Sequence, residues 1–181
     1  MCDFAVRNIP LIKTRKIVYM KKKKLNDLSK IGIVGGLYVA LSLLLAPVSF
    51  GALQLRVSET FNHLAILNKR YIWGVTLGCA IANIFSPLGV IDVVIGSLST
   101  LMMLAISYFL SKRIEDIKKR MIINTLICST IGMLPIALEL VFIFQMPFLI
   151  TWGGLFVSEI ISMTFGGIVI YHINKRIDLT E

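Results

Sequence analysis

The chain has 181 residues, of which 56% are hydrophobic and 16% are charged, and its mean hydropathy is +0.83. A soluble domain of this size cannot bury so much apolar surface, so the composition indicates an integral membrane protein. The formal net charge is +9, but the basic residues stand in short runs between apolar stretches, which argues against a nucleic-acid interface and for orientation in a membrane.

Residues 1–30 form a polar, basic lead-in without a steady helical or strand period, and we expect no regular structure in them. The run KKKKLNDLSK directly follows Met20, which is a plausible alternative start, so residues 1–19 are expected to be dispensable. The next apolar stretch carries no clear small-residue cleavage site, which disfavours a signal peptide. We therefore predict a cytoplasmic segment over residues 1–30.

Six apolar segments follow, each judged against the roughly 20 residues that a helix needs to cross a bilayer. The second is short and polar enough to be a half-depth helix. Tight breaks at residues 86–89 (SPLG) and 145–147 (QMP) separate neighbouring spans, because proline cannot continue a helix. The prediction is an all-α membrane protein with spans at about residues 31–49, 57–68, 71–85, 91–111, 121–144 and 148–173.

The distribution of positive charge predicts the orientation. With a cytoplasmic amino terminus, 18 of the 19 Lys and Arg residues fall in cytoplasmic segments, which predicts that both termini lie inside the cell. Residues 31–175 then form the membrane domain, and residues 176–181 form a cytoplasmic tail. The one basic residue left over is Arg56, and an arginine at mid-membrane costs roughly 2.5 to 3.5 kcal/mol, so it needs a partner or a function.

Four carboxylates share the outer half of the membrane with Arg56 in this topology. Glu59 and Asp92 begin descending spans, while Glu139 and Glu159 lie inside long apolar helices, where an ionisable residue usually serves function. A structural explanation is available for some of them. Arg56 and Glu59 could pair to cap a short helix, and Asp92 could be the N-cap of its span.

Four further side chains complete the candidate site. Gln54 is next but one to Arg56, and His63 follows Glu59 by four residues on the same helical face. Asn83, at the outer end of the third span, could bond either a substrate or the backbone. Trp152, near an outer break, could stack on a flat ligand or anchor the helix at the interface.

Sequence motifs of other chemistries are absent. The chain has no GxxxxGK[ST], HExxH or GxSxG pattern, which argues against ATP hydrolysis, metalloprotease and lipase activity by the chain itself. Cys2, Cys79 and Cys128 show neither CxxC nor histidine-paired spacing, so we expect free thiols, no metal and no cofactor. An intramembrane enzyme that uses carboxylates and a histidine as acid and base is the alternative from a different class; its candidates are Glu139, Glu159 and His63.

Small residues recur every four positions in the first span. Gly32, Gly36 and Ala40 in GIVGGLYVA line one helical face, which allows another helix to approach closely. The partner could be a helix of the same bundle or a helix of another protein.

Two blocks carry a family resemblance: FGALQLRVSE at 50–59 and CAIANIFSPLGVIDVVIGSLST at 79–100. They closely resemble the QueT family, the substrate-binding membrane subunits of energy-coupling factor (ECF) transporters for queuosine precursors, and the likeness covers about residues 37–175. It implies six helices that bind a vitamin-like solute from outside and dock on a transmembrane coupling subunit driven by two cytoplasmic ATPases. In related subunits a small-xxx-small pattern, often of alanines, makes that contact, and here Gly36 replaces an alanine.

The resemblance implies a 7-deazaguanine substrate, with another vitamin-like solute as the alternative. The first loop and second helix would cover an outward-facing pocket. Arg56 would anchor this cover or bind a purine-like carbonyl, and Glu59 would accept a hydrogen bond from a ligand amine. Four carboxylates against one arginine give the outer half a formal charge of −3 if all are ionised, which favours a cation. We therefore predict 7-aminomethyl-7-deazaguanine, whose amine is protonated at neutral pH, over the uncharged 7-cyano compound.

Overall fold

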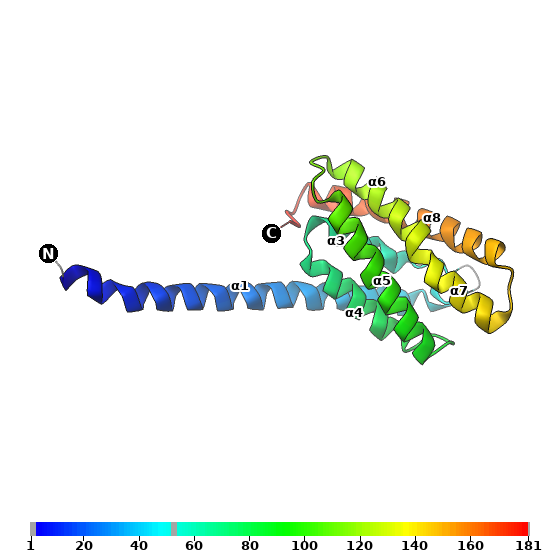
Figure 1. Cartoon of the computed structure of the whole chain (residues 1–181), viewed down its shortest axis with the longest axis horizontal. Coiled ribbons are helices and arrows are strands. Elements are labelled where there is room, and N and C mark those ends of the chain that lie inside the picture. Colours follow the sequence, from blue (N-terminus) through cyan, green and yellow to red (C-terminus); the bar gives the residue numbers. More distant parts are fainter. Residues whose placement is uncertain (1–2, 52–53, 181) are drawn as a thin grey trace.

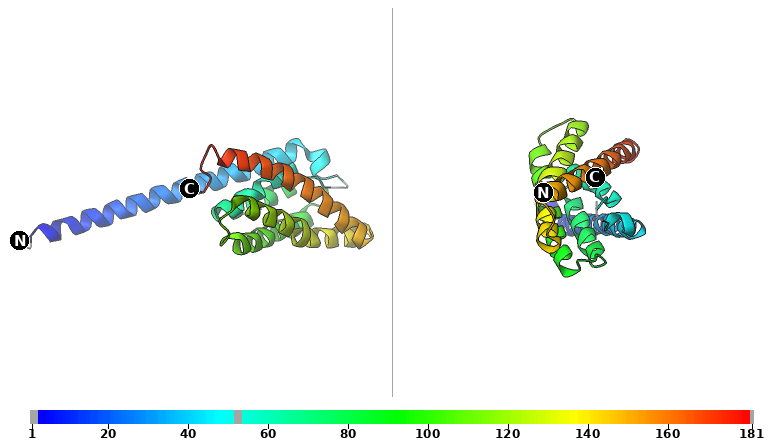
Figure 2. Two further views of the ribbon diagram at one scale, coloured as in Figure 1. Left: turned by 90° about the horizontal axis from the view of Figure 1, so that it is seen from above. Right: turned by 90° about the vertical axis from the view of Figure 1, so that its right-hand side faces the viewer.

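The computed structural model describes residues 3–51 and 54–180, and their side chains from residue 18 onward. All regular elements in this part of the chain are helical. Figure 1 shows a bundle from which the first half of α1 projects alone, and Figure 2 shows the same arrangement from two further sides. In chain order the elements are α1 (Asp3–Leu44), α2 (Ala46–Ser49), η1 (Val57–Phe61), α3 (Asn62–Leu67), α4 (Arg70–Asn83), α5 (Val90–Ser111), α6 (Ile117–Ile127), η2 (Cys128–Gly132), α7 (Met133–Phe144) and α8 (Phe148–Asn174).

Four stretches of the described chain are long and apolar enough to cross a membrane: Val18–Leu44, Val90–Ser111, Ile117–Phe144 and Phe148–Asn174. They match the first, fourth, fifth and sixth predicted spans. η1 and α3 occupy the short second segment, and α4 has 14 residues, or about 21 Å of helix against a hydrocarbon core of about 30 Å. The all-helical prediction is confirmed, with four helices of spanning length.

The expectation of an irregular lead-in is wrong for the described residues, because α1 begins at Asp3 and continues through the basic segment. Lys, Arg, Leu and Met are good helix formers, so this helix does not depend on an amphipathic period. The first span also ends at Leu44 and not at residue 49, since Pro47 disfavours further helix in the residues before it.

A single π-helical turn, η2, interrupts the fifth predicted span. Pro135 has no N–H to offer the carbonyl of Ile131 four residues earlier, which breaks the regular helical pattern. Side chains from other helices bond carbonyls in the turn instead: the Trp152 indole N–H donates to the Thr130 oxygen at 3.2 Å, and the Ser99 hydroxyl donates to the Gly132 oxygen. This turn was not predicted from the sequence, although Pro135 marks it.

α1 and α4 cross at glycines. A Cβ added to Gly35 would lie 3.0 Å from the Gly74 carbonyl oxygen, and one added to Gly78 would lie 2.8 Å from Tyr38 Cβ. The crossing therefore requires residues without side chains at these positions. It brings Tyr38, which is fully buried, into the middle of the bundle.

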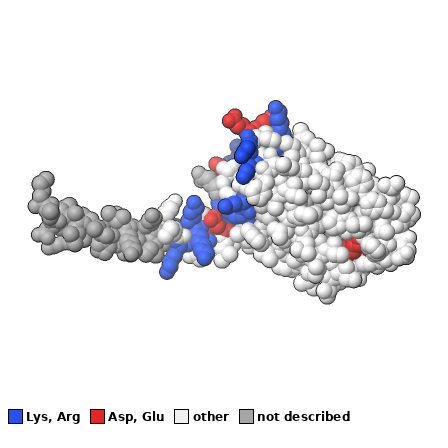
Figure 3. All heavy atoms as spheres, viewed as in Figure 1, with Lys and Arg blue, Asp and Glu red and all other residues white. Residues whose placement is uncertain are grey.

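Charge is distributed unevenly along the bundle. Figure 3 shows Lys and Arg side chains gathered at the end where α1 leaves the bundle and where α6 begins, while the visible surface toward the other end is almost uncharged. At the basic end, Arg70 of α4 pairs with Asp27 of α1. This asymmetry is typical of proteins oriented in a membrane by their basic loops.

Candidate functional site

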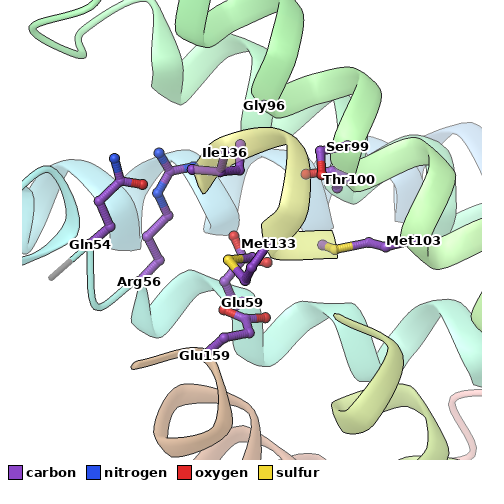
Figure 4. Close-up of a pocket in the computed structure, with 10 residues that line it drawn as sticks. All are labelled: Gln54, Arg56, Glu59, Gly96, Ser99, Thr100, Met103, Met133, Ile136 and Glu159. Atoms are coloured by element: carbon purple, nitrogen blue, oxygen red, sulfur yellow. The ribbon is translucent and has the colours of Figure 1, made fainter. Parts of the chain in front are cut away.

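A narrow pocket, here called the central pocket, lies between the loop before η1, η1 itself, α5, α7 and α8 (Figure 4). Its empty volume is about 340 Å³ including the mouth, but the side chains leave space for little more than a water molecule. A larger solute therefore needs side chains in the wall to move. The lining residues are Gln54, Arg56, Glu59, Gly96, Ser99, Thr100, Met103, Met133, Ile136 and Glu159.

Arg56 pairs with Asp92 and not with Glu59, contrary to the capping alternative. Its Nη2 lies 3.6 Å from Asp92 Oδ2, and its guanidinium carbon lies 5.6 Å from the centroid of the Phe50 ring. Within the described residues, Arg56 Nε and Nη2 and both Asp92 carboxylate oxygens lack hydrogen-bond partners. The pair balances charge inside the bundle while leaving guanidinium donors available to a ligand.

Glu59 is held from two sides. The Tyr38 hydroxyl of α1 donates to Glu59 Oε1 at 2.6 Å, and Asn62 Nδ2 donates to Glu59 Oε2. η1 can carry Glu59 against α8 because Gly166 has no side chain, since a Cβ there would lie 2.5 Å from Thr60 Cα. This close approach places the carboxylate of Glu59 beside that of Glu159, as Figure 4 shows.

Glu159 has a free acceptor in the central pocket. The residue is only 3% exposed, and its Oε1 has no hydrogen-bond partner in the part of the chain that the structure describes. A buried carboxylate without partners is costly in a membrane protein. A ligand with a hydrogen-bond donor, and above all a cationic one, would satisfy Glu159.

His63 lies outside the central pocket, in a polar network that links four helices. Its Nε2–H donates to the Met163 carbonyl oxygen at 2.9 Å, and Asn124 Nδ2 donates to its Nδ1 at 3.2 Å. The Ser107 hydroxyl in turn donates to Asn124 Oδ1 at 2.6 Å. Both ring nitrogens are occupied, so the network accounts for His63 as a structural residue.

Asn83, Trp152 and Glu139 also lie away from the central pocket. Asn83 Nδ2 donates to the backbone oxygen of Asp92 at 2.9 Å, so Asn83 bonds the backbone, which was one of its two predicted roles. Trp152 donates to a carbonyl of the π-helical turn η2. Glu139 is buried beside a groove at the start of α5, and its oxygens have no partner among the described residues. The pocket thus brings together Gln54, Arg56, Glu59 and Glu159 from the predicted set, with Asp92 behind Arg56.

The wall of the central pocket that α5 contributes was not predicted from the sequence. Gly96, Ser99, Thr100 and Met103 have the i, i+3, i+4, i+7 spacing of one helical face, and all four line the pocket. The signal was present as the adjacent hydroxyls of Ser99 and Thr100 in the middle of a largely apolar span. Tyr38, which holds Glu59, was missed because its contact depends on the crossing of α1 and α4.

The small-residue face of α1 is open. Apart from the adjoining part of α1 itself, nothing in the described chain lies within 4 Å of a Cβ added to Gly32 or Gly36, and Ala40 is exposed. Gly35, one position away, makes the crossing with α4 instead. The face of Gly32, Gly36 and Ala40 is therefore free of packing within the bundle.

Comparison with known proteins identifies the family. The sequence model of the QueT transporter family matches residues 28–175. The queuosine precursor transporter QueT of Lactococcus lactis subsp. cremoris is 40% identical over 171 residues, which cover 90% of this chain and 100% of the relative. No solved structure matches the chain. The chain therefore belongs to the QueT transporter family and is a multi-pass membrane transport protein, not an enzyme.

Proposed function

We propose that this chain is the substrate-binding subunit of an ECF-type importer and that it captures 7-aminomethyl-7-deazaguanine, a queuosine precursor. The name of the 40% identical relative supports the class of substrate. The observation that favours the aminomethyl compound among queuosine precursors is the buried Oε1 of Glu159 in the central pocket, which has no hydrogen-bond partner among the described residues. Beside it stands a second carboxylate, Glu59, and Arg56 is the one cation among the lining residues.

The pocket offers a complementary group for each part of this ligand. A protonated amine donates to Glu159 in a charge-assisted hydrogen bond, worth about 1.5 to 3 kcal/mol. The free guanidinium donors of Arg56 suit the ring carbonyl. Met103 and Met133 are flexible and unbranched, so they can move aside to admit a flat bicyclic ring.

Titration of the purified protein with both precursors tests this function. We expect the aminomethyl compound to bind about ten- to more than a hundredfold more tightly than the 7-cyano compound, because the nitrile has no proton to donate to Glu159. Isothermal titration calorimetry in one detergent gives both affinities. Equal affinities, or a tighter cyano compound, would contradict the proposed role of the carboxylates.

We further propose six membrane segments with both termini in the cytoplasm, in which η1, α3 and α4 supply the second and third. The basic end of the bundle supports this orientation. In this arrangement residues 1–30 and 176–181 are cytoplasmic, and residues 31–175 form the substrate-binding domain.

Cysteine labelling tests the orientation. With Cys2, Cys79 and Cys128 replaced by serine, Gln145→Cys should react with a membrane-impermeant maleimide on intact cells, because it lies in the exposed turn between α7 and α8. Lys175→Cys, just after α8, should react only after permeabilisation. The reverse pattern would invert the topology.

The proposed partners are a transmembrane coupling subunit and two ATPase subunits, since this chain has no phosphate-binding loop of its own. The open face of Gly32, Gly36 and Ala40 is the proposed docking surface for the coupling subunit, because a partner helix can approach its backbone closely.

A further inference from the structure

A second cavity, here called the α6–α8 groove, opens on the side of the bundle. It runs between α6, which begins the spanning stretch Ile117–Phe144, and α8, and it has about 920 Å³ of empty space including its open side. Apolar side chains line its length, among them Ile122, Leu126, Ile160 and Ile168. Gly167 deepens the floor, since a Cβ there would lie only 3.1 Å from His63 Nε2.

The groove ends at a pair of lysines. Lys118 and Tyr171 line this end, and the Lys118 Nζ lies 5.4 Å from the centroid of the Tyr171 ring. Lys175 Nζ lies 4.7 Å from the same centroid, so both ammonium groups make cation–π contacts with the Tyr171 ring and lie near each other. Across residues 18–51 and 54–180, neither ammonium is within ion-pair distance of a carboxylate. The end of the groove is therefore positively charged and without an acidic partner.

We propose that the α6–α8 groove binds an anionic phospholipid, with one acyl chain along the groove and the phosphate at Lys118 and Lys175. The groove lies on the membrane-spanning part of α6 and α8, where lipid is the surrounding medium. The two lysines favour an anionic headgroup over a zwitterionic one, because each basic residue near a membrane surface adds attraction to anionic lipid. This inference rests on the membrane location of the protein and not on the transported substrate.

Lipid binding to the delipidated full-length protein tests the inference. Native mass spectrometry would compare dioleoyl-phosphatidylglycerol with dioleoyl-phosphatidylcholine, and we expect the anionic lipid to bind preferentially. Lys118→Gln and Lys175→Gln should each lower its affinity about fivefold. Thr164→Trp fills the groove and leaves both lysines intact. It should lower the affinity for phosphatidylglycerol, because the acyl chain no longer fits in the groove.

The matched control is Lys22→Gln combined with Lys23→Gln, which removes two charges from the cleft beside α1. We expect this variant to keep the phosphatidylglycerol preference, because the headgroup contact is local to Lys118 and Lys175. An equal loss in this control would assign the preference to overall charge and overturn the proposal. Equal binding of both lipids by the wild-type protein would also overturn the lipid proposal, and it would favour a protein partner as the occupant of the groove.

Discussion

Glu159→Gln is expected to lower the affinity for 7-aminomethyl-7-deazaguanine about ten- to more than a hundredfold while changing that for the 7-cyano compound little. The amide keeps the size of the side chain but loses the negative charge, so its oxygen can accept from a protonated amine but without the attraction between opposite charges. Oε1 of Glu159 is buried and has no partner among the described residues, so the ligand bond replaces no existing one. Calorimetric titration of the variant with both compounds gives the two affinities.

Glu139→Gln is the matched control for this experiment. Glu139 is buried to a similar degree, but it lines a different groove from the central pocket. The same substitution there should leave the ratio of the two affinities unchanged. If Glu159→Gln keeps the wild-type ratio, the amine does not bind at Glu159. Loss of the preference in Glu139→Gln instead would show that general charge sets the selectivity.

Gly36→Leu is expected to abolish uptake while leaving substrate binding intact. Apart from the adjoining part of α1 itself, no described atom lies within 4 Å of a Cβ at Gly36, so a leucine fits the isolated subunit without disturbing its fold. The same side chain would project from the open face of α1 and hold a partner helix away from the backbone. Uptake by cells and titration of the purified variant measure the two effects separately.

Gly35→Leu provides the contrast one position away. Its Cβ would lie 3.0 Å from the Gly74 oxygen, so the α1–α4 crossing must open and both binding and uptake should fall. A lower melting temperature would identify the cause as lost packing. Normal uptake by Gly36→Leu, together with normal assembly with its coupling partners, would show that the docking assignment is wrong.

Local signals in the sequence were sufficient to place most helices. The SPLG break lies between the end of α4 at Asn83 and the start of α5 at Val90, and the QMP break separates Phe144 of α7 from Phe148 of α8. Proline and glycine act on the backbone within a few residues, so their effects can be predicted without knowledge of the fold. Pro135 is the exception, because a uniform apolar run concealed the π turn that it accompanies.

The site was harder to predict because it depends on how the helices are rotated against one another. Glu139 and Glu159 both stand inside long, largely apolar helices, yet only Glu159 lines the central pocket. His63 shares a helical face with Glu59, but Met163 and Asn124 occupy both its ring nitrogens. Such contacts join residues 61 and 100 positions apart, and no local pattern encodes them.

The two sides of α1 connect the central pocket to the proposed docking surface. Tyr38 holds Glu59, whereas Gly36, about 200° away around the helix, faces outward. A coupling subunit that displaces α1 would therefore disturb the hydroxyl that orients a carboxylate of the pocket. Thermodynamic reciprocity then applies: whatever factor docking imposes on substrate affinity, bound substrate imposes on docking. Docking that disturbs the pocket weakens substrate binding, so bound substrate weakens docking by the same factor, and assembly with the coupling module would promote release of the cargo from the pocket.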